Sequence, residues 1–160
     1  TGLRFFTVYG PWGRPDMAPM KFTKAILEKK PIEIFNYGKM SRSFTYIDDV
    51  VEIIFKLLKK PAGSNKELKT KNSISSKVLP PHMIFNIGNS NSIQLNDFIV
   101  CLEKELGIKA NKEYLSMQQG DVKKTQSDNY LIEKWIGELP NTNLEIGIKK
   151  FINWYLNYYF

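Results

Sequence analysis

The sequence predicts an α/β domain, and three features of its 160 residues support that prediction. Short apolar runs rich in β-branched and aromatic residues alternate along the chain with longer stretches whose apolar residues recur at helical spacing. Hydrophobic residues make up 42% of the sequence, enough for the core of one domain of this length. No internal repeat divides the chain. We therefore expect one domain over residues 1–160.

The opening residues predict a buried strand, because residues 3–9 are nearly all apolar or aromatic. This strand ends at a loop over residues 10–18, which is rich in Gly and Pro and holds a single arginine, Arg14. A helix is expected over residues 19–30, where apolar residues follow helical spacing, and Pro31 should end it.

The next stretch predicts a β-hairpin followed by a helix. Residues 32–36 and 43–47 are short apolar runs joined by the turn sequence YGKMS, so we expect them to pair with each other. Residues 50–60 have strong helical periodicity. We expect Asp48 and Asp49 to cap this helix, since acidic residues at its start and lysines at its end suit its dipole.

The second half of the chain continues the alternation after a long polar stretch. Residues 61–80 contain few apolar residues, which predicts a mobile surface insertion around residues 61–82. After it we expect a strand over 83–87, a helix within 88–107 with Gln94, Asn96 or Asp97 near its cap, a strand running into a loop within 112–122, and helices over 128–137 and 144–158.

Composition excludes several classes of protein. No apolar run approaches the roughly 18 residues of a membrane-spanning helix, so we expect no membrane partner. The formal net charge is +7, but the lysines are spread along the chain and often lie near glutamates, which argues against a nucleic-acid partner. Cys101 is the only cysteine. A disulfide framework is therefore impossible, and we expect a cytoplasmic location.

Three charged residues are candidates for ligand binding. Arg14 on its rigid loop and Arg42 at a turn-to-strand junction could each fork onto a carboxylate or phosphate. Asp121 follows Gly120 at a loop tip, where a carboxylate can accept from both hydroxyls of a ribose. The competing interpretations are a solvated loop arginine, a hairpin surface charge and an ordinary turn aspartate.

Other apparent motifs favour structural interpretations. Tyr130 and Lys134 have the spacing of a short-chain dehydrogenase pair, but they lie on an expected amphipathic helix late in the chain. Residues 10–13 do not resemble a dinucleotide loop, because Pro and Trp crowd the approach that a pyrophosphate needs. His82 is the only histidine and follows two prolines, so we expect no metal site.

Four motifs together resemble one family. In order they are RFFTVYGPWGRPDMA, PIEIFNYGKMSRSFTYIDDV, FNIGNSNSIQLNDFI and MQQGDV. They resemble the carboxyl-terminal, substrate-binding half of the extended short-chain dehydrogenase/reductase nucleotide-sugar epimerases, and among these the UDP-glucuronate 4-epimerases most. The likeness runs from Thr1 to about Tyr159, interrupted around residues 61–82. It implies the last strands of a Rossmann-like sheet and a small α/β lobe.

The resemblance implies a UDP-hexuronate ligand and a role for nine residues. NAD in the intact enzyme would take a hydride from C4 of the sugar and return it to the other face after the 4-keto intermediate rotates. The implied contacts are Thr7 with the sugar, Arg14 with its carboxylate, Lys21 and Phe35 with uridine, Arg42 with the pyrophosphate, Gln118 and Asp121 with the ribose, and Phe5 and Val8 with the nicotinamide.

The sequence departs from the family pattern in two ways. Ser43 stands where the family usually has an acidic residue, which removes a possible charge partner of Arg42. The chain also contains neither the glycine-rich NAD loop nor the catalytic tyrosine–lysine pair of the family's amino-terminal half. We therefore expect no epimerisation by this chain alone and no tight NAD binding. The family's homodimer cannot be assumed for this chain.

Two further interpretations remain open beside a substrate-binding half. The chain starts at Thr1 with a strand almost at once, so we expect a piece of a longer polypeptide whose amino-terminal half is a partner. The alternative is a non-catalytic remnant or interaction module from a split gene. A basic nucleic-acid-binding domain is the third interpretation.

Overall fold

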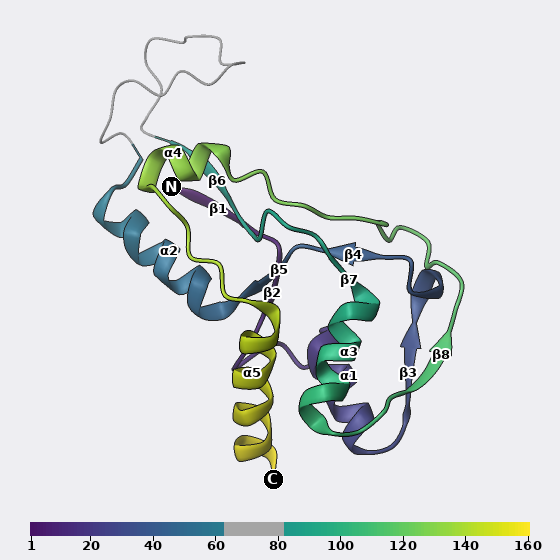
Figure 1. Cartoon of the computed structure of the whole chain (residues 1–160). Helices are drawn as coiled ribbons and strands as arrows, with labels where there is room; N and C mark the ends of the chain where they lie inside the picture. The colour runs from purple at the N-terminus through teal and green to yellow at the C-terminus, as the bar shows by residue number, and fades with distance from the viewer. Residues whose placement is uncertain (63–81) are drawn as a thin grey trace.

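The computed structural model describes residues 1–62 and 82–160, and it has the mixed α/β architecture that the sequence predicts (Figure 1). The helices in this part of the chain are α1 (Ala18–Leu27), the 3-10 helix η1 (Phe35–Gly38), α2 (Ile47–Lys59), α3 (Leu95–Leu106), α4 (Tyr130–Ile136) and α5 (Leu144–Tyr159). The strands are β1 (Gly2–Phe5), β2 (Thr7–Tyr9), β3 (Pro31–Ile34), β4 (Ser41–Arg42), β5 (Phe44–Tyr46), β6 (Ile84–Ile87), β7 (Ile93–Gln94) and β8 (Asn111–Tyr114).

Strand pairing is mostly parallel and joins segments far apart in the sequence. β1 pairs with β6, β2 with β5 and β3 with β8, all parallel, while β4 and β7 form a short antiparallel pair. The expected hairpin between residues 32–36 and 43–47 is therefore wrong. The turn after β3 is the 3-10 helix η1, in which Asn36 and Tyr37 adopt left-handed backbone angles, and the chain leaves it toward β4 instead of returning along β3.

The expected strand over residues 3–9 is divided into β1 and β2 at Phe6. The Phe6 N–H still donates to the carbonyl of Ile87 at 3.1 Å, but the strand then changes its partner from β6 to β5. Gly88 makes this crossing possible, because a Cβ at that position would lie 2.8 Å from the Phe6 ring. The change of partner joins the two halves of the molecule.

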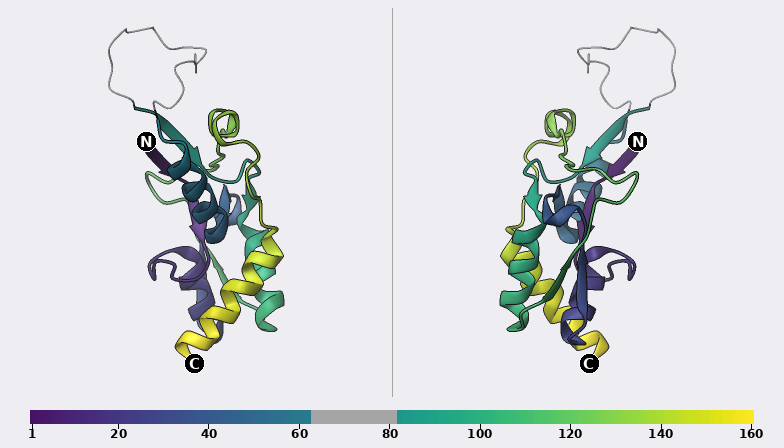
Figure 2. Two further views of the ribbon diagram at one scale, coloured as in Figure 1. Left: turned by 90° about the vertical axis from the view of Figure 1, so that its left-hand side faces the viewer. Right: turned by 90° about the vertical axis from the view of Figure 1, so that its right-hand side faces the viewer.

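The described residues form two separate hydrophobic cores, one at each end of the molecule (Figure 1). The larger core packs α1, α3 and α5 against β2, β3 and β5, and its fully buried members include Phe98, Phe151 and Ile34. The smaller core packs α2 and α4 against β6 around Phe85 and Trp135. Figures 1 and 2 show these groups of helices at opposite ends, with the termini far apart.

The ends of two helices differ from the sequence-based expectation. α1 stops at Leu27, and Lys29 takes a left-handed φ of 56° that turns the chain into β3 at Pro31. α2 starts at Ile47, so neither Asp48 nor Asp49 caps it. The carboxylate of Asp49 instead accepts from the backbone N–H and hydroxyl of Thr142, at 2.8 and 2.6 Å.

The second half of the chain follows the predicted order of elements. β6, α3, β8, α4 and α5 lie within a few residues of the expected positions. The sequence does not predict the two-residue strand β7 or its partner β4 in the first half. The insertion expected around residues 61–82 falls almost wholly on residues 63–81, outside the described residues. In the two described stretches, no helix is both long and apolar enough to cross a membrane.

Candidate functional site

A cavity of about 480 Å³ opens between α1, β3 and the segment that carries Arg42. Its apolar wall comes from α1, from β3 and from Met40, Phe44 and Leu95. Cationic and anionic side chains border the same space. The charged or hydrogen-bonding residues that line it are Thr7, Asp16, Lys21, Glu33, Arg42, Glu113 and Asp121.

Five of the nine residues singled out by the sequence line this cavity, and four do not. Thr7, Lys21, Phe35, Arg42 and Asp121 come from five separate elements or loops and border one space. The four outside its lining are Phe5, Val8, Arg14 and Gln118.

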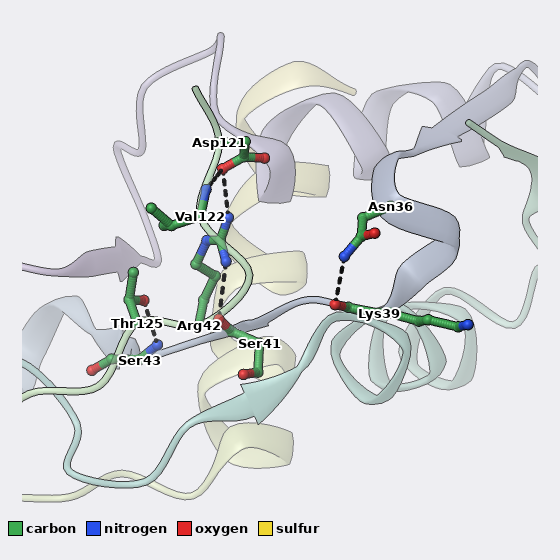
Figure 3. A network of polar contacts seen from close by, with 8 residues as sticks. All are labelled: Asn36, Lys39, Ser41, Arg42, Ser43, Asp121, Val122 and Thr125. Atoms are coloured by element: carbon green, nitrogen blue, oxygen red, sulfur yellow. Dashed lines mark hydrogen bonds and ion pairs between the residues drawn. The ribbon is translucent and has the colours of Figure 1, made fainter. Parts of the chain in front are cut away.

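Arg42 and Asp121 form an ion pair on the cavity wall (Figure 3). Nη2 of Arg42 donates to Oδ1 of Asp121 at 2.8 Å, and Nη1 donates to the Ser41 carbonyl at 3.0 Å. The same carboxylate oxygen accepts from the N–H of Val122 at 2.8 Å. The two side chains are 17% and 30% exposed, so both charges are partly shielded from water and oriented by several hydrogen bonds.

Backbone pairing brings Asp121 to Arg42 across 79 residues. The N–H of Ser41 donates to the Lys123 carbonyl at 3.0 Å, and the N–H of Thr125 donates back to Ser41 at 3.1 Å. The loop that carries Asp121 is therefore held as if it were an extra strand beside β4.

Ser43 has a different role from the acidic residue that the family pattern suggests. Its side chain is fully buried, and its hydroxyl donates to the carbonyl of Asn89 at 2.5 Å. Its backbone N–H donates to the hydroxyl of Thr125 at 3.3 Å. Asp121 provides the carboxylate partner of Arg42 that Ser43 cannot provide.

Arg14 lies outside the cavity, with its guanidinium occupied by a neighbour. Nε donates to Oδ1 of Asp16 at 3.1 Å, and Nη2 donates to Oδ2 at 2.5 Å. Asp16, unlike Arg14, lines the cavity. The hydrogen bond from Arg14 lowers the pKa of the Asp16 carboxyl below its ordinary value. Both side chains are more than half exposed to solvent.

The loop that carries Arg14 is anchored at two points. Gly10 has a φ of 138°, and a Cβ there would lie 2.5 Å from a methyl carbon of Ile47. Trp12 adopts a left-handed φ of 61°, and its ring packs on Trp154 and Tyr158 of α5, with centroids 5.5 and 4.9 Å away. These contacts explain the glycine and tryptophan that surround the lone arginine.

Sequence reasoning missed three carboxylates at the cavity, Asp16, Glu33 and Glu113. Glu33 and Glu113 lie directly opposite each other in the parallel pairing of β3 with β8. The alternation of IEI in β3 was the available signal, since Ile32 and Ile34 are buried and Glu33 is exposed. The partner strand could not be identified in the same way.

The motifs given structural interpretations lie away from the cavity. Tyr130 and Lys134 lie on α4, with the ammonium 4.5 Å from the ring centroid. His82 is exposed, and across residues 1–62 and 82–160 no group of three His, Cys, Asp or Glu side chains is arranged to hold a metal. Trp135, on the same helix, is fully buried in the smaller core.

Comparison with known proteins identifies the family. The model of the NAD dependent epimerase/dehydratase family matches residues 1–88. The chain is 46% identical over 159 residues to the protein CapI of Staphylococcus aureus, covering 99% of this chain and 48% of CapI. It is 44% identical to UDP-glucuronate 4-epimerase 4 of Arabidopsis thaliana, covering 99% of this chain and 36% of that enzyme.

The fold agrees with the solved structures of such enzymes. The UDP-glucuronic acid 4-epimerase of Bacillus cereus, in complex with UDP-glucuronic acid and NAD, superposes with a TM-score of 0.79 at 33% identity. The match covers 98% of this chain and 45% of the enzyme, so the chain is a partial Rossmann-type fragment in this comparison. It spans about half the length of the curated relative CapI. The chain belongs to the NAD dependent epimerase/dehydratase family.

Proposed function

We propose that this chain is the substrate-binding portion of an NAD-dependent UDP-hexuronate 4-epimerase. In the intact enzyme the reaction interconverts UDP-glucuronate and UDP-galacturonate. One observation carries the proposal: Thr7, Lys21, Phe35, Arg42 and Asp121 line a single cavity of about 480 Å³, a volume typical of small-ligand sites.

The proposed roles follow from the chemistry of each wall. Arg42 offers charge-assisted donors to the pyrophosphate, and its hydrogen bonds to Asp121 and Ser41 orient the guanidinium in advance. Asp121 accepts from ribose hydroxyls through Oδ2, since Oδ1 is engaged by Arg42. Gln118 precedes Asp121 in the same turn, where its carbonyl accepts from the Asp121 N–H at 3.3 Å, and it contributes at the rim.

The remaining residues are proposed to contact the uridine and the sugar of the ligand. Lys21 on α1 and Phe35 at the start of η1 border the uridine, and the ring of Phe35 provides an apolar face for the base. Thr7 contacts the sugar. Arg14, one loop away, pairs with the hexuronate carboxylate, for which the planar fork of a guanidinium is suited.

The residues of this chain fit the nucleotide sugar better than they fit NAD. The β2–α1 loop holds Pro11 and Trp12 where a pyrophosphate cradle needs open glycine backbone, and Trp12 packs against α5. NAD bound to an intact enzyme would supply the acceptor for the C4 hydride. We assign no step of that transfer to these residues, and we limit Phe5 and Val8 to bordering the nicotinamide.

The fragment alone is proposed to be inactive, and a non-catalytic remnant from a split gene is the alternative. The native mass separates the two. A polypeptide about twice the 18.6 kDa of this chain supports the enzyme, whereas a native mass near 18.6 kDa supports the remnant.

Calorimetric titration of the chain with UDP and UDP-glucuronate tests the binding function. We expect both to bind, and we expect Arg42→Ala to weaken both because each carries the pyrophosphate. Inorganic phosphate serves as a control for nonspecific attraction to a chain of net charge +7. Failure of UDP to bind at millimolar concentration would contradict the proposal.

A further inference from the structure

Asp16 occupies the position that the proposed function gives to the ligand. Its two carboxylate oxygens accept from Nε and Nη2 of Arg14, the bidentate arrangement in which a guanidinium holds a carboxylate. Asp16 lines the cavity and Arg14 does not. Asp16 therefore borders the cavity proposed for the ligand and occupies the bidentate face of Arg14.

We propose that Asp16 is an internal competitor for the sugar carboxylate and thereby a specificity-determining residue, which a hexuronate displaces from Arg14 and a neutral hexose does not. The inference rests on the proposed function and deepens it. The recognised group is a carboxylate on the sugar of a uridine diphosphate sugar, and the step is an exchange of one ion pair for another.

The exposure of the pair makes such an exchange feasible. The side chains are 75% and 59% exposed, and an exposed ion pair contributes little to stability because water screens it. The pair of Arg42 and Asp121 differs, because its side chains are 17% and 30% exposed and each has a further hydrogen bond with the backbone. Arg14 is therefore the arginine that can change partners.

The freed Asp16 has a second cation nearby. The charge of Lys21 also acts on its carboxyl, and Lys21 lines the same cavity. The backbone of the loop does not have to move, since Trp12 still packs against α5 and the Met17 N–H still donates to the Arg14 carbonyl. Only side-chain rotation is required.

The test compares three ligands on four proteins by calorimetry. UDP-glucuronate, UDP-glucose and UDP are titrated into the unchanged chain, Asp16→Asn, Glu33→Gln and the double variant Asp16→Asn/Arg14→Ala. Glu33 is the matched control, because it is another carboxylate of the same cavity and reports the general effect of removing a negative charge.

Asp16→Asn is expected to raise the affinity for UDP-glucuronate about threefold more than the affinity for UDP-glucose or UDP. This ratio is in the range of the free energy of an exposed ion pair. Glu33→Gln removes a cavity charge without freeing Arg14, so its selective gain for the more highly charged UDP-glucuronate should be smaller than that of Asp16→Asn. The selective gain of Asp16→Asn should vanish in the double variant. Equal changes for the three ligands in Asp16→Asn would overturn the inference while leaving the proposed function intact. Absence of UDP binding to the unchanged chain would overturn both.

A second measurement needs no variant at Asp16. The Nε–H resonance of Arg14, assigned by its loss in Arg14→Lys, is followed by NMR during titration of the unchanged chain. We expect it to shift with UDP-glucuronate and to stay in place with UDP-glucose. An identical response to the two sugars would contradict the exchange.

Discussion

The surroundings of Arg14 and Arg42 are the instructive comparison in this molecule. Both arginines lie at or beside a turn, and the sequence marks both as anion-binding candidates. Arg14 finds its partner two residues away on its own loop, and the pair stays exposed. Arg42 finds its partner 79 residues away, inside a network that ties the Asp121 loop to β4.

The difference shows how one residue type can be fixed in one region and exchangeable in another. A partly buried pair with extra hydrogen bonds holds its geometry, because loss of either member leaves the other charge poorly solvated. A solvent-exposed neighbour pair can part at little cost. The contrast supports the proposal that Arg42 binds the part of the ligand common to all UDP-sugars and Arg14 the part that varies.

The largest expected effect on stability comes from crowding the contact between α5 and β2. In Gly147→Ala on α5, the new methyl would lie 2.1 Å from the hydroxyl of the buried Tyr9, so either the Tyr9 ring or α5 would have to shift. We expect a loss of about 2–4 kcal/mol in the free energy of unfolding. Urea denaturation measures it, with Ile146→Ala, an exposed neighbour on the same helix, as control. Equal stability of the two variants would contradict the close approach of the Tyr9 ring to Gly147.

Arg42→Ala is expected to have the next largest effect. It leaves Asp121 partly buried without its cation, which costs about 1–3 kcal/mol of stability. It should also weaken UDP binding by about 10-fold or more, since a charge-assisted contact is lost. Arg42→Lys keeps the charge but not the fork, and it should recover only part of the affinity. Full recovery by lysine would mean that the fork geometry has no importance.

The pH dependence of stability tests how firmly β8 and its preceding loop, which lead to Asp121, are held to α3. Glu103 on α3 is buried, and burial alone would raise its pKa. Hydrogen bonds from the Ala110 N–H, Lys112 and Lys109 outweigh burial and lower the pKa below the ordinary 4.5. A lowered pKa in the folded state means that the stabilisation is complete above pH 4.5 and is lost as the pH falls through the folded-state pKa.

The prediction is a component of acid destabilisation that depends on Glu103. In Glu103→Gln this component should be absent from urea midpoints measured between pH 6 and pH 3, so the difference in stability between variant and unchanged chain should narrow as pH falls. Parallel pH profiles for the two proteins would show that the hydrogen bonds from β8 and its flanking loop do not favour the ionised carboxylate.

The smallest effect on stability is expected for Arg14→Ala. Thermal unfolding should be nearly unchanged, because the pair it removes is exposed. UDP-glucuronate binding should weaken several-fold while UDP binding stays the same. A loss of stability comparable to that of Arg42→Ala would erase the contrast between the two regions, and equal weakening of both ligands would remove the carboxylate role.

Much of the local structure could be predicted from the sequence, because its causes are local. Alternating apolar residues in IEI marked β3, helical periodicity marked α2 and α5, and Gly107 ends α3 in a left-handed conformation. The wrong predictions concern which strands pair with each other. Short apolar runs across a turn usually pair, which predicts a hairpin between residues 32–36 and 43–47, but β3 pairs with β8 and β5 pairs with β2.

In the candidate site too, single residues could be predicted from the sequence, whereas the contacts between them could not. The loop with Arg14, the junction with Arg42 and the turn with Asp121 were recognisable as single candidates from residue type and neighbouring turn residues. Their sequence did not show that Arg42 and Asp121 are partners, that Asp16 holds Arg14, or that Glu33 faces Glu113. Such contacts depend on which strands lie side by side.

The sequence by itself determined the alternation of strands and helices, the apolar faces, and the family, because these depend on the order and spacing of side chains. Only the tertiary structure decided the strand partners, the change of partner at Phe6 and the enclosure of the cavity. The physical reason is that parallel pairing joins distant segments through intervening helices. The free energies that select one partner over another come from packing and hydrogen bonds that no local stretch contains.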